Sequence, residues 1–402
     1  MRIAVASSGL GHVARGIETW AADTADALHG AGVNVTLFAA GPVSSAAPRV
    51  VVPCLRRRTG LNSLLVRLMP GPTWRWGLKD GYGWEQLTFW LRLRHHLTCG
   101  AYDILHVQDP MLAFWCRRAR RAGRIAAKEI LAHGTEEPLT FLSQFDYVQH
   151  LAPWHLEQSA QAVPPGGPER SWAAIPNFVD TQKFRPADSD DERAAARRQF
   201  GIPADAFVVG TAAAIKRHHK RIDHLIREFG IFRARACATP VGANAPREPF
   251  LVIAGSRQPD TPLLRALAEQ VAPGRVLFLV DQPRDRMPAL LRCYDVFALT
   301  SLFEMMPIAL LEAIATGLPV LTNDHPVLAW MGGEGGMRID MAAEGALAAA
   351  LGALTPDQHA RLARGARAHA VAAFSAHAVI QQYIAYYHTV LGTAPAGSLQ
   401  GA

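Results

Sequence analysis

Residues 300–323 of the chain read TSLFEMMPIALLEAIATGLPVLTN, and this stretch decides the fold. One apolar strand is predicted to end at Leu299–Thr300, and the next apolar run, LPVLTN, follows after only a short helix. Pro307 fits the first helical position, where its missing N–H is not needed. Gly317 fits the position just past the helix end, and Pro319 prevents the helix from continuing. Strand, short helix and strand in this order are typical of an open parallel α/β sheet.

The same alternation of strands and helices runs through both halves of the chain. In the first half, strands are predicted at RIAVAS, VNVTLFAAG, YDILHVQ, GRIAAKEILAHG and FDYVQHLAP. In the second half they are predicted at FVVGTAA, PFLVIAGS, RVLFLV, YDVFALT and LPVLTN, with a helix over HHKRIDHLIREFGIFRA. These strands are apolar throughout, as expected for a sheet covered by helices on both faces. We therefore predict an α/β protein with two Rossmann-like lobes.

The boundary between the lobes is expected near the loop-like stretch 161–174 and the turn-rich connector that follows it. The first domain is then residues 1–177, completed by a C-terminal helix at 375–392. The second domain is residues 178–374, and residues 393–402 are expected to form a disordered tail. Two domains agree with a chain of 402 residues.

Composition limits the class of partner and the compartment. The formal net charge of +7 and the sequence pI of about 9.4 favour anionic partners, such as nucleotide phosphates or acidic lipid surfaces. The five cysteines are scattered without a C-x-x-C pair, which indicates a reduced protein without a zinc site. The N-terminus does not resemble a signal peptide, and no apolar run approaches the ~20 residues of a spanning helix. We expect a cytoplasmic protein that touches the inner face of a membrane without crossing it.

An anion site is predicted where the short helix begins, because free backbone N–H groups and the helix dipole meet there at a strand's carboxyl end. Glu304 lies just before this helix and Glu312 on it, and carboxylates accept hydrogen bonds from the vicinal hydroxyls of ribose or sugars. The turn IKRHHKR follows another predicted strand and holds Lys216 and Lys220. Surface glutamates and a solvated basic turn are the alternative interpretation.

FEMMPIALLEAIATGLPVL resembles the signature of the retaining family 4 glycosyltransferases of the GT-B fold: Glu, seven residues, Glu, a small-residue helix end and Gly-x-Pro-Val. IPNFVDTQKFRP resembles the family's connector between lobes, and KRIDHLIREF resembles its basic helix. HVQDP and LAHG are similar to its N-terminal strand ends. The motifs occur in the family's order over about residues 1–390. The resemblance implies two lobes that face each other across an interlobe cleft, with the acceptor lobe at residues 1–177 and the donor-nucleotide-binding lobe at residues 178–374.

The resemblance also implies roles for individual residues. Glu312 would bind the nucleotide ribose, Glu304 would contact the donor sugar, and Lys220 would bind the diphosphate and act in catalysis together with Glu304. The family commonly carries glycines after the first glutamate, where this chain has Met305 and Met306. The identity of the donor sugar therefore does not carry over.

A second cation is expected at the diphosphate. The family's usual arginine stands five places before the lysine, and here that position is Ile215. We expect Lys216 or Arg217 to replace it, with Lys216 favoured. Backbone N–H groups of Met305, Met306 and the helix that starts near Pro307 complete the predicted donor contacts.

The glycine-rich turn GLGHVARG in the first half has two interpretations. Gly9, Gly11 and Ala14 fit the dinucleotide fingerprint G-x-G-x-x-A, but the next strand ends in LFAAG without the acidic residue that a nicotinamide site needs. A dehydrogenase is therefore disfavoured. The resemblance implies instead that this loop approaches the donor phosphates, most closely at Gly11 and Gly16. It also makes His133, in LAHG, the cleft histidine near the reacting sugar and a candidate catalytic residue.

The stretch 54–96 carries eight Arg and Lys residues and only two acids. Basic and aromatic residues together predict a membrane surface or a lipid-linked acceptor, with peripheral membrane contact through residues 55–96. A basic glycan-binding loop is an alternative, helices that pack their tryptophans inward are another, and no nucleic-acid partner is expected. The tryptophans concerned are Trp74, Trp76, Trp84 and Trp90.

These features predict a retaining transferase that moves a sugar from a nucleoside diphosphate sugar to a hydroxyl of a glycan or lipid-linked glycan. No metal or further cofactor is expected, because Asp188-Ser189-Asp190 precedes a predicted helix and is explained by helix capping. A sugar-nucleotide epimerase or hydrolase, a binding protein without transfer activity, and a glycosidase that uses Glu304 and Glu312 remain alternatives.

Overall fold

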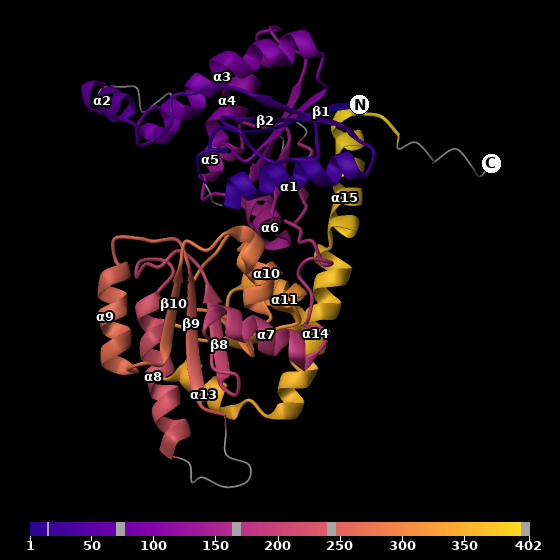
Figure 1. Cartoon of the computed structure of the whole chain (residues 1–402). Coiled ribbons are helices and arrows are strands. Elements are labelled where there is room, and N and C mark those ends of the chain that lie inside the picture. The colour runs from indigo at the N-terminus through magenta and orange to yellow at the C-terminus, as the bar shows by residue number, and fades with distance from the viewer. Residues whose placement is uncertain (14–15, 70–76, 163–169, 239–246, 395–402) are drawn as a thin grey trace, which may run out of the picture. The chain divides into compact units, whose positions relative to one another are not determined.

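The computed structural model divides the chain into two compact units (Figure 1). Unit 1 combines Met1–Asn177 with Val379–Ala402, and unit 2 is Phe178–Ala378. The structure describes residues 1–13, 16–69, 77–162, 170–238 and 247–394. Ala14, Trp74, Trp76, half of the predicted boundary loop and most of the predicted tail lie outside the described residues.

Unit 1 contains a parallel sheet of seven strands in the order β3-β2-β1-β4-β5-β6-β7. The five predicted strands are present, and the two that the sequence did not indicate, β3 and β7, are only three and two residues long. The strands are β1 (Arg2–Ser7), β2 (Asn34–Ala39), β3 (Arg49–Val51), β4 (Ile104–Val107), β5 (Lys128–His133), β6 (Val148–His150) and β7 (Ala173–Ala174). The helices are α1 (Gly16–Gly30), α2 (Gly60–Leu68), α3 (Gly81–Gly100), α4 (Pro110–Arg121), α5 (Leu139–Leu142), α6 (Pro153–Ala162) and α15 (Ala376–Leu391).

The C-terminal helix α15 packs onto the first half of the chain through buried aromatic and polar groups. The Tyr387 hydroxyl lies 2.8 Å from Nδ1 of the fully buried His106, whose Nε2 lies 2.8 Å from Gln149 Oε1. Tyr383 accepts hydrogen bonds from Trp20 and Gln149 at 3.1 and 2.9 Å. Burial lowers the pKa of His106 to about 3, so its ring is neutral and can donate from one nitrogen while it accepts at the other.

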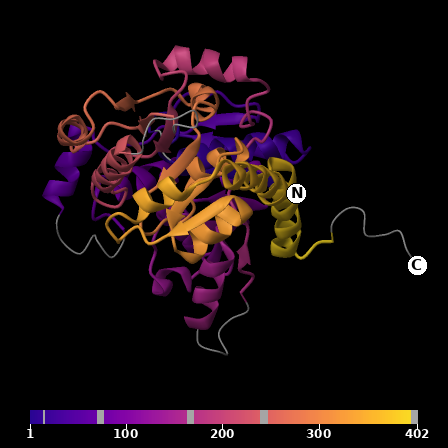
Figure 2. The same ribbon diagram turned by 90° about the horizontal axis from the view of Figure 1, so that it is seen from below.

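Unit 2 contains a parallel sheet of six strands in the order β10-β9-β8-β11-β12-β13, with helices on both sides (Figures 1 and 2). All five predicted strands are present, and β13 is the addition. The strands are β8 (Phe207–Ala212), β9 (Pro249–Gly255), β10 (Val276–Val280), β11 (Val296–Leu299), β12 (Val320–Asn323) and β13 (Gly336–Ile339). The α-helices are α7 (Asp190–Phe200), α8 (Ile222–Ala238), α9 (Thr261–Val271), α10 (Met287–Leu291), α11 (Ile308–Ala315), α12 (Pro326–Gly332), α13 (Ala346–Ala353) and α14 (Pro356–Phe374).

The helix after β11 ends as predicted but begins one residue later. Gly317 has φ +77°, and the N–H groups of Gly317 and Leu318 donate to Ile314 O and Ala313 O at 3.0 and 3.1 Å. This pair of bonds is the Schellman pattern, which requires a left-handed residue just past the helix end. Pro307 was expected at the first helical position. It is instead the N-cap, with ψ 118°, so Ile308 is the first helical residue.

The helix predicted over HHKRIDHLIREFGIFRA also begins later than expected. His219 and Arg221 have φ of +68° and +49°, which a right-handed helix does not allow. Residues 218–221 therefore form a turn, and α8 begins at Ile222. Lys220 lies in this turn rather than on the helix.

Both sheets have a point where the direction of the strand order reverses. In unit 1 it lies between β1 and β4, and in unit 2 between β8 and β11. In open α/β sheets, ligands bind outside the carboxyl ends of the strands at such a switch point. Among the described residues, no helix combines the length and the apolar character needed to cross a bilayer.

Candidate functional site

The switch point of unit 2 brings together two residues predicted from the sequence. Lys220 follows β8 and Glu304 follows β11, and Lys220 Nζ forms a salt bridge with Glu304 Oε1. The other oxygen of Glu304 lies 3.8 Å from His219 Nε2. The Glu304 side chain is 8% exposed and that of Lys220 is 18% exposed. The pair is thus shielded but still reaches solvent through the lysine.

The turn that carries Lys220 is fixed to the end of β11. The Thr300 hydroxyl lies 3.0 Å from Lys220 O and 3.1 Å from Arg221 O, and donates to these carbonyls. Positive φ at His219 and Arg221 is unfavourable for residues with a side chain and persists only where the surroundings impose it. The backbone on both sides of Lys220 is therefore held in one conformation.

Positive charge dominates this turn. Burial lowers the pKa of His219, and the charges of Lys220 and Lys216 lower it further, while Glu304 opposes them. His219 is therefore neutral at neutral pH. The charges of Lys216 and Lys220 thus lower the same pKa, that of His219.

Lys216 and Arg217, the two candidates for the second cation, differ in their partners. The Arg217 backbone N–H donates to Asp260 Oδ2 at 2.9 Å, and its Nε lies 3.8 Å from Asp260 Oδ1. The Lys216 ammonium makes no hydrogen bond or ion pair within the described part of the chain. Ile215 is fully buried in the core of unit 2, which explains why no cation stands at that position.

The other predicted donor contacts lie on α11 or directly before it. Glu312, on α11, is 7% exposed, and Met306 is 6% exposed. Met305 is half-buried, and Pro307 caps the helix. Since Met306 is packed inside unit 2, this segment is part of the wall of the site rather than a loose loop.

In unit 1, His133 ends β5 and contacts a second histidine that the sequence analysis did not single out. His150 ends the neighbouring strand β6, and the two Nδ1 atoms are 3.1 Å apart. Burial lowers the pKa of His133 to about 4 and that of His150 to about 3, and nearby histidines add to both shifts. One neutral ring therefore donates its proton to the other. Nε2 of His133 is buried without a partner among the described residues.

The two glycines predicted to approach the donor differ in their surroundings. Gly11 has φ +98°, and a Cβ there would lie 2.6 Å from the Gly41 backbone. Its need for glycine is thus explained by packing against Gly41 within unit 1. Gly16 is exposed at the first position of α1.

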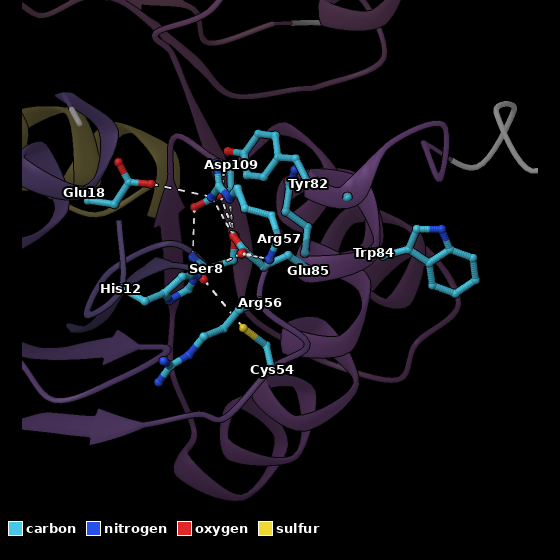
Figure 3. A network of polar contacts seen from close by, with 12 residues as sticks. Ser8, His12, Glu18, Cys54, Arg56, Arg57, Tyr82, Trp84, Glu85 and Asp109 are labelled. Carbon is cyan, nitrogen blue, oxygen red and sulfur yellow. Dashed lines mark hydrogen bonds and ion pairs between the residues drawn. The ribbon is translucent and has the colours of Figure 1, made fainter. Parts of the chain in front are cut away.

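A polar network at the switch point of unit 1 was missed by the sequence analysis (Figure 3). Asp109 follows β4 and Ser8 follows β1, and Asp109 Oδ1 accepts hydrogen bonds from Ser8 Oγ at 2.8 Å and Tyr82 OH at 2.7 Å. Asp109 is fully buried, and burial raises the pKa of its carboxyl group. The motif HVQDP holds this aspartate, but nothing in the sequence pairs it with Ser8 or Tyr82.

The second half of this network is centred on Glu85, which is also fully buried. Glu85 accepts hydrogen bonds from the backbone N–H of Arg57 at 2.7 Å and from its Nε at 2.8 Å, and it lies 2.8 Å from His12 Nε2. The Arg57 guanidinium stacks 4.1 Å from the centre of the Tyr82 ring and lies 3.6 Å from Glu18 Oε1. These contacts tie the loops after β1 and β3 to α3.

The Asp188-Ser189-Asp190 motif caps a helix. Ser189 is the N-cap of α7 and accepts a hydrogen bond from the Glu192 N–H at 3.2 Å, while Asp188 lies 3.0 Å from Arg185 Nη1. Within the described ranges, no group of three or more His, Cys, Asp or Glu side chains is placed to hold a metal ion.

Two family models match the chain in succession. The model described as Glycosyltransferase Family 4 matches residues 14–163, and the model described as Glycosyl transferases group 1 matches residues 192–367. The first match falls in unit 1 and the second in unit 2, and together they cover well over half of the chain.

Curated relatives match over part of their length. A D-inositol 3-phosphate glycosyltransferase from Salinispora tropica is 35% identical over 215 residues, which is 48% of this chain and 41% of the relative. The putative glycosyltransferase EpsF of Bacillus subtilis is 33% identical over 155 residues, or 37% and 35% of the two chains. The chain therefore spans less than half the length of these relatives.

Solved structures match over nearly the whole chain. A sucrose-phosphate synthase from Thermosynechococcus elongatus has a TM-score of 0.75 at 18% identity and covers 97% of this chain and 99% of its own. Anabaena HepE, solved with UDP-glucose, has a TM-score of 0.69 at 16% identity, with 98% and 100% covered. At these identities the similarity establishes the fold. With both lobes matched in chain order, the chain belongs to the family 4 glycosyltransferases and has the GT-B fold.

Proposed function

We propose that this chain transfers a sugar from a nucleoside diphosphate sugar to an acceptor hydroxyl, with retention of anomeric configuration and without a metal ion. The observation that carries the proposal is the Lys220–Glu304 salt bridge at the switch point of unit 2, directly before α11. In this proposal, Lys220 is the cation that binds the diphosphate, and Glu304 is the carboxylate that binds the donor sugar.

The diphosphate is the group that needs stabilisation, because it gains negative charge as the glycosidic bond breaks. Lys220, Lys216 and the N-terminus of α11 supply fixed positive charge for it. When a diphosphate binds, the Lys220 ammonium turns from Glu304 to the phosphate oxygens. The Glu304 carboxylate is then free to accept hydrogen bonds from sugar hydroxyls. Glu312 takes the ribose in the same way.

In the proposed reaction, the bond between the anomeric carbon and the phosphate oxygen breaks while the acceptor oxygen bonds to the same face of the sugar. The acceptor hydroxyl proton passes to the leaving phosphate. His133 contacts the reacting sugar through Nε2, and its neutral ring suits a hydrogen bond to a hydroxyl. The backbone around Gly11 and Gly16 approaches the donor phosphates.

The comparisons support a nucleotide sugar as the donor. The Anabaena neighbour was solved with UDP-glucose, and the Salinispora tropica relative is named a D-inositol 3-phosphate glycosyltransferase. We propose a glycan or a lipid-linked glycan as the acceptor and no nucleic-acid partner. We further propose a cytoplasmic protein that meets the inner face of a membrane through residues 55–96.

The test compares Lys220→Ala with Lys183→Ala, an exposed lysine of the same unit. Transfer is assayed with UDP-, GDP- and ADP-sugars against a panel of glycan acceptors, and NMR of the product reads the anomeric configuration. We expect Lys220→Ala to lower kcat/KM by at least ~100-fold, as for the loss of a group that stabilises transition-state charge. Lys183→Ala should keep full activity and the urea midpoint of the parent, while Lys220→Ala should stay folded and lose about 1 kcal/mol of stability with its salt bridge. Normal turnover in Lys220→Ala would remove the diphosphate assignment.

The same assay separates the rival functions. Conversion of the donor without an acceptor identifies an epimerase or hydrolase. A thermal shift with a nucleotide sugar, but no transfer to any acceptor, identifies a binding protein. Loss of transfer in EDTA, with recovery on addition of Mg²⁺ or Mn²⁺, would refute metal independence.

A further inference from the structure

Helix α2 exposes apolar side chains that an ordinary surface helix would bury. Leu61, Leu64 and Leu68 are 60%, 49% and 67% exposed, whereas Asn62 is fully buried. Apolar residues spaced i, i+3 and i+7 form the stripe that normally faces the core. In α2 this stripe faces outward, and the polar residue faces the protein.

Hydrogen bonds hold α2 in this orientation at the margin of unit 1, beside α3 (Figure 1). The Asn62 side-chain amide donates to Gly81 O at 3.0 Å and lies 3.3 Å from both Leu55 O and Arg56 O. Thr59 caps the helix and accepts a hydrogen bond from the Asn62 N–H at 3.4 Å. A rotation that buried the leucines would break these bonds inside the protein, so the outward stripe is built into the fold.

The apolar stripe is flanked by positive charge without negative charge. Met69, 43% exposed, extends the stripe past the end of the helix. Residues 49–69 contain five arginines and no Asp or Glu. Arg57 is turned inward to Glu85, while the other four are exposed. An apolar strip with a cationic rim is the pattern of helices that lie in the interface of an anionic membrane.

We propose that this patch docks the protein on the surface of an anionic lipid bilayer. The α2 docking surface consists of Leu61, Leu64, Leu68, Met69, Arg56, Arg58 and Arg67. The leucines and Met69 insert among the acyl chains nearest the headgroups, while the arginines bind lipid phosphates. A second copy of this chain is disfavoured as the occupant, since two such surfaces face to face would oppose arginine to arginine.

The docking surface deepens the acceptor part of the proposed function and rests on it only for the identity of the acceptor. Unit 1, the proposed acceptor lobe, would be held where a lipid-linked acceptor presents its headgroup. The docking surface also assigns the membrane contact proposed above for residues 55–96 to α2. Binding to a bilayer needs no sugar transfer, so failure of vesicle binding would remove that contact alone, and failure of transfer would remove the proposed reaction alone. Transfer to a soluble acceptor tests the first, and vesicle binding tests the second.

The experiment measures co-sedimentation of the purified full chain with vesicles of phosphatidylcholine alone and of an equimolar mixture with phosphatidylglycerol. We expect binding to the mixed vesicles that weakens as salt is raised, because exposed charges are screened. The combined change Leu61→Gln, Leu64→Gln and Leu68→Gln should lower the partition coefficient more than roughly tenfold at every salt concentration. Arg56→Gln, Arg58→Gln and Arg67→Gln should each lower it about fivefold at low salt only.

Leu263→Gln is the matched control, because Leu263 is 54% exposed on α9 in unit 2. It should bind vesicles like the parent. All variants should keep the parent's thermal midpoint and its transfer to a soluble acceptor, since the residues changed lie outside the donor site. Absence of binding to phosphatidylglycerol vesicles, or equal binding by the triple leucine variant, would overturn the proposal. So would a parent dimer that becomes monomeric on light scattering only when the leucines are replaced, because the stripe would then be a contact between copies.

Discussion

The two units place opposite charges at the same point of the same architecture. At the switch point between β1 and β4, the Arg57 guanidinium pairs with the buried carboxylates of Glu18 and Glu85, and the buried carboxyl group of Asp109 joins the same network through Ser8 and Tyr82. Between β8 and β11, the Lys220 ammonium pairs with the Glu304 carboxylate, and the charges of Lys220 and Lys216 both lower the pKa of the neighbouring His219. The first arrangement offers no net positive charge to a diphosphate, whereas the second does.

The two sites also differ in how many partners the central carboxylate has and in whether those partners reach solvent. Glu85 is fully buried and contacts Arg57 and His12 through both carboxylate oxygens, which ties loops together. Glu304 has Lys220 as its close partner, and that lysine reaches solvent. We infer that the unit 1 network holds a structure in place, while the unit 2 pair is available to exchange partners with a ligand.

The same substitution at each centre tests this difference most strongly. Glu85→Gln removes the closer charged partner of the Arg57 guanidinium, which is only 11% exposed, and leaves Glu18 at 3.6 Å. Breaking one side of a buried ion pair costs about 3–5 kcal/mol. Glu304→Gln should cost about 1 kcal/mol, because Lys220 can turn to water. Urea unfolding followed by circular dichroism measures both values, and equal costs would contradict the distinction.

The loss of catalytic activity should follow the reverse order, with a larger loss in Glu304→Gln than in Glu85→Gln. We expect Glu304→Gln to lower kcat by about 100-fold, because an amide can neither balance the Lys220 charge nor accept sugar hydroxyls as strongly as a carboxylate. Glu85→Gln should lose activity only in proportion to the unfolded fraction. Steady-state kinetics on protein shown to be folded makes the comparison. A folded Glu85→Gln with strongly reduced kcat would place the unit 1 network in the reaction itself.

The sequence predicted the fold well, whereas the roles assigned to the donor-site residues stay predictions. Every strand predicted from an apolar run is present, because such runs indicate strands buried on both faces. Gly317 was assigned correctly from the chemistry of helix ends. The predicted start of α8 was several residues too early, since the left-handed conformations of His219 and Arg221 are imposed by tertiary contacts such as those of Thr300. The predicted start of α11 was one residue too early, because Pro307 is the N-cap.

The unit 1 site could not be predicted because its members are far apart in the chain. Ser8, Tyr82 and Asp109 meet only when β1 and β4 pair and α3 packs beside them. His150 contacts His133 because of the register between β5 and β6, which no local pattern specifies. Trp90 illustrates the alternative left open for the aromatic residues, since it packs into the core of unit 1.

Buried histidines should make unit 1 sensitive to mild acid. His133 and His150 have pKa values lowered from 6.5 to about 4 and about 3. As pH falls below about 6.5, these histidines become protonated in the unfolded chain but stay neutral in the folded protein. The free energy of unfolding therefore falls by up to about 1.4 kcal/mol per pH unit for each histidine. The raised pKa of Asp109 opposes this at lower pH, where its folded carboxyl binds a proton first.

Urea unfolding between about pH 7 and pH 5 measures this slope. His150→Gln should reduce it, because one buried titrating ring is removed. His29→Gln, which changes an exposed histidine of unit 1, should leave it as in the parent. A slope unaffected by His150→Gln would show that the acid sensitivity arises elsewhere.

The smallest expected effect distinguishes the two candidates for the second cation in unit 2. Arg217 is already held by Asp260, whereas Lys216 acts on the same turn as Lys220. Lys216→Ala should therefore weaken nucleoside diphosphate binding about tenfold, the equivalent of one ion pair of about 1.4 kcal/mol. Arg217→Ala should weaken it less than about threefold. Calorimetric titration with UDP, GDP and ADP measures both, and a larger loss in Arg217→Ala would reverse the assignment and show that Asp260 releases the arginine to the ligand.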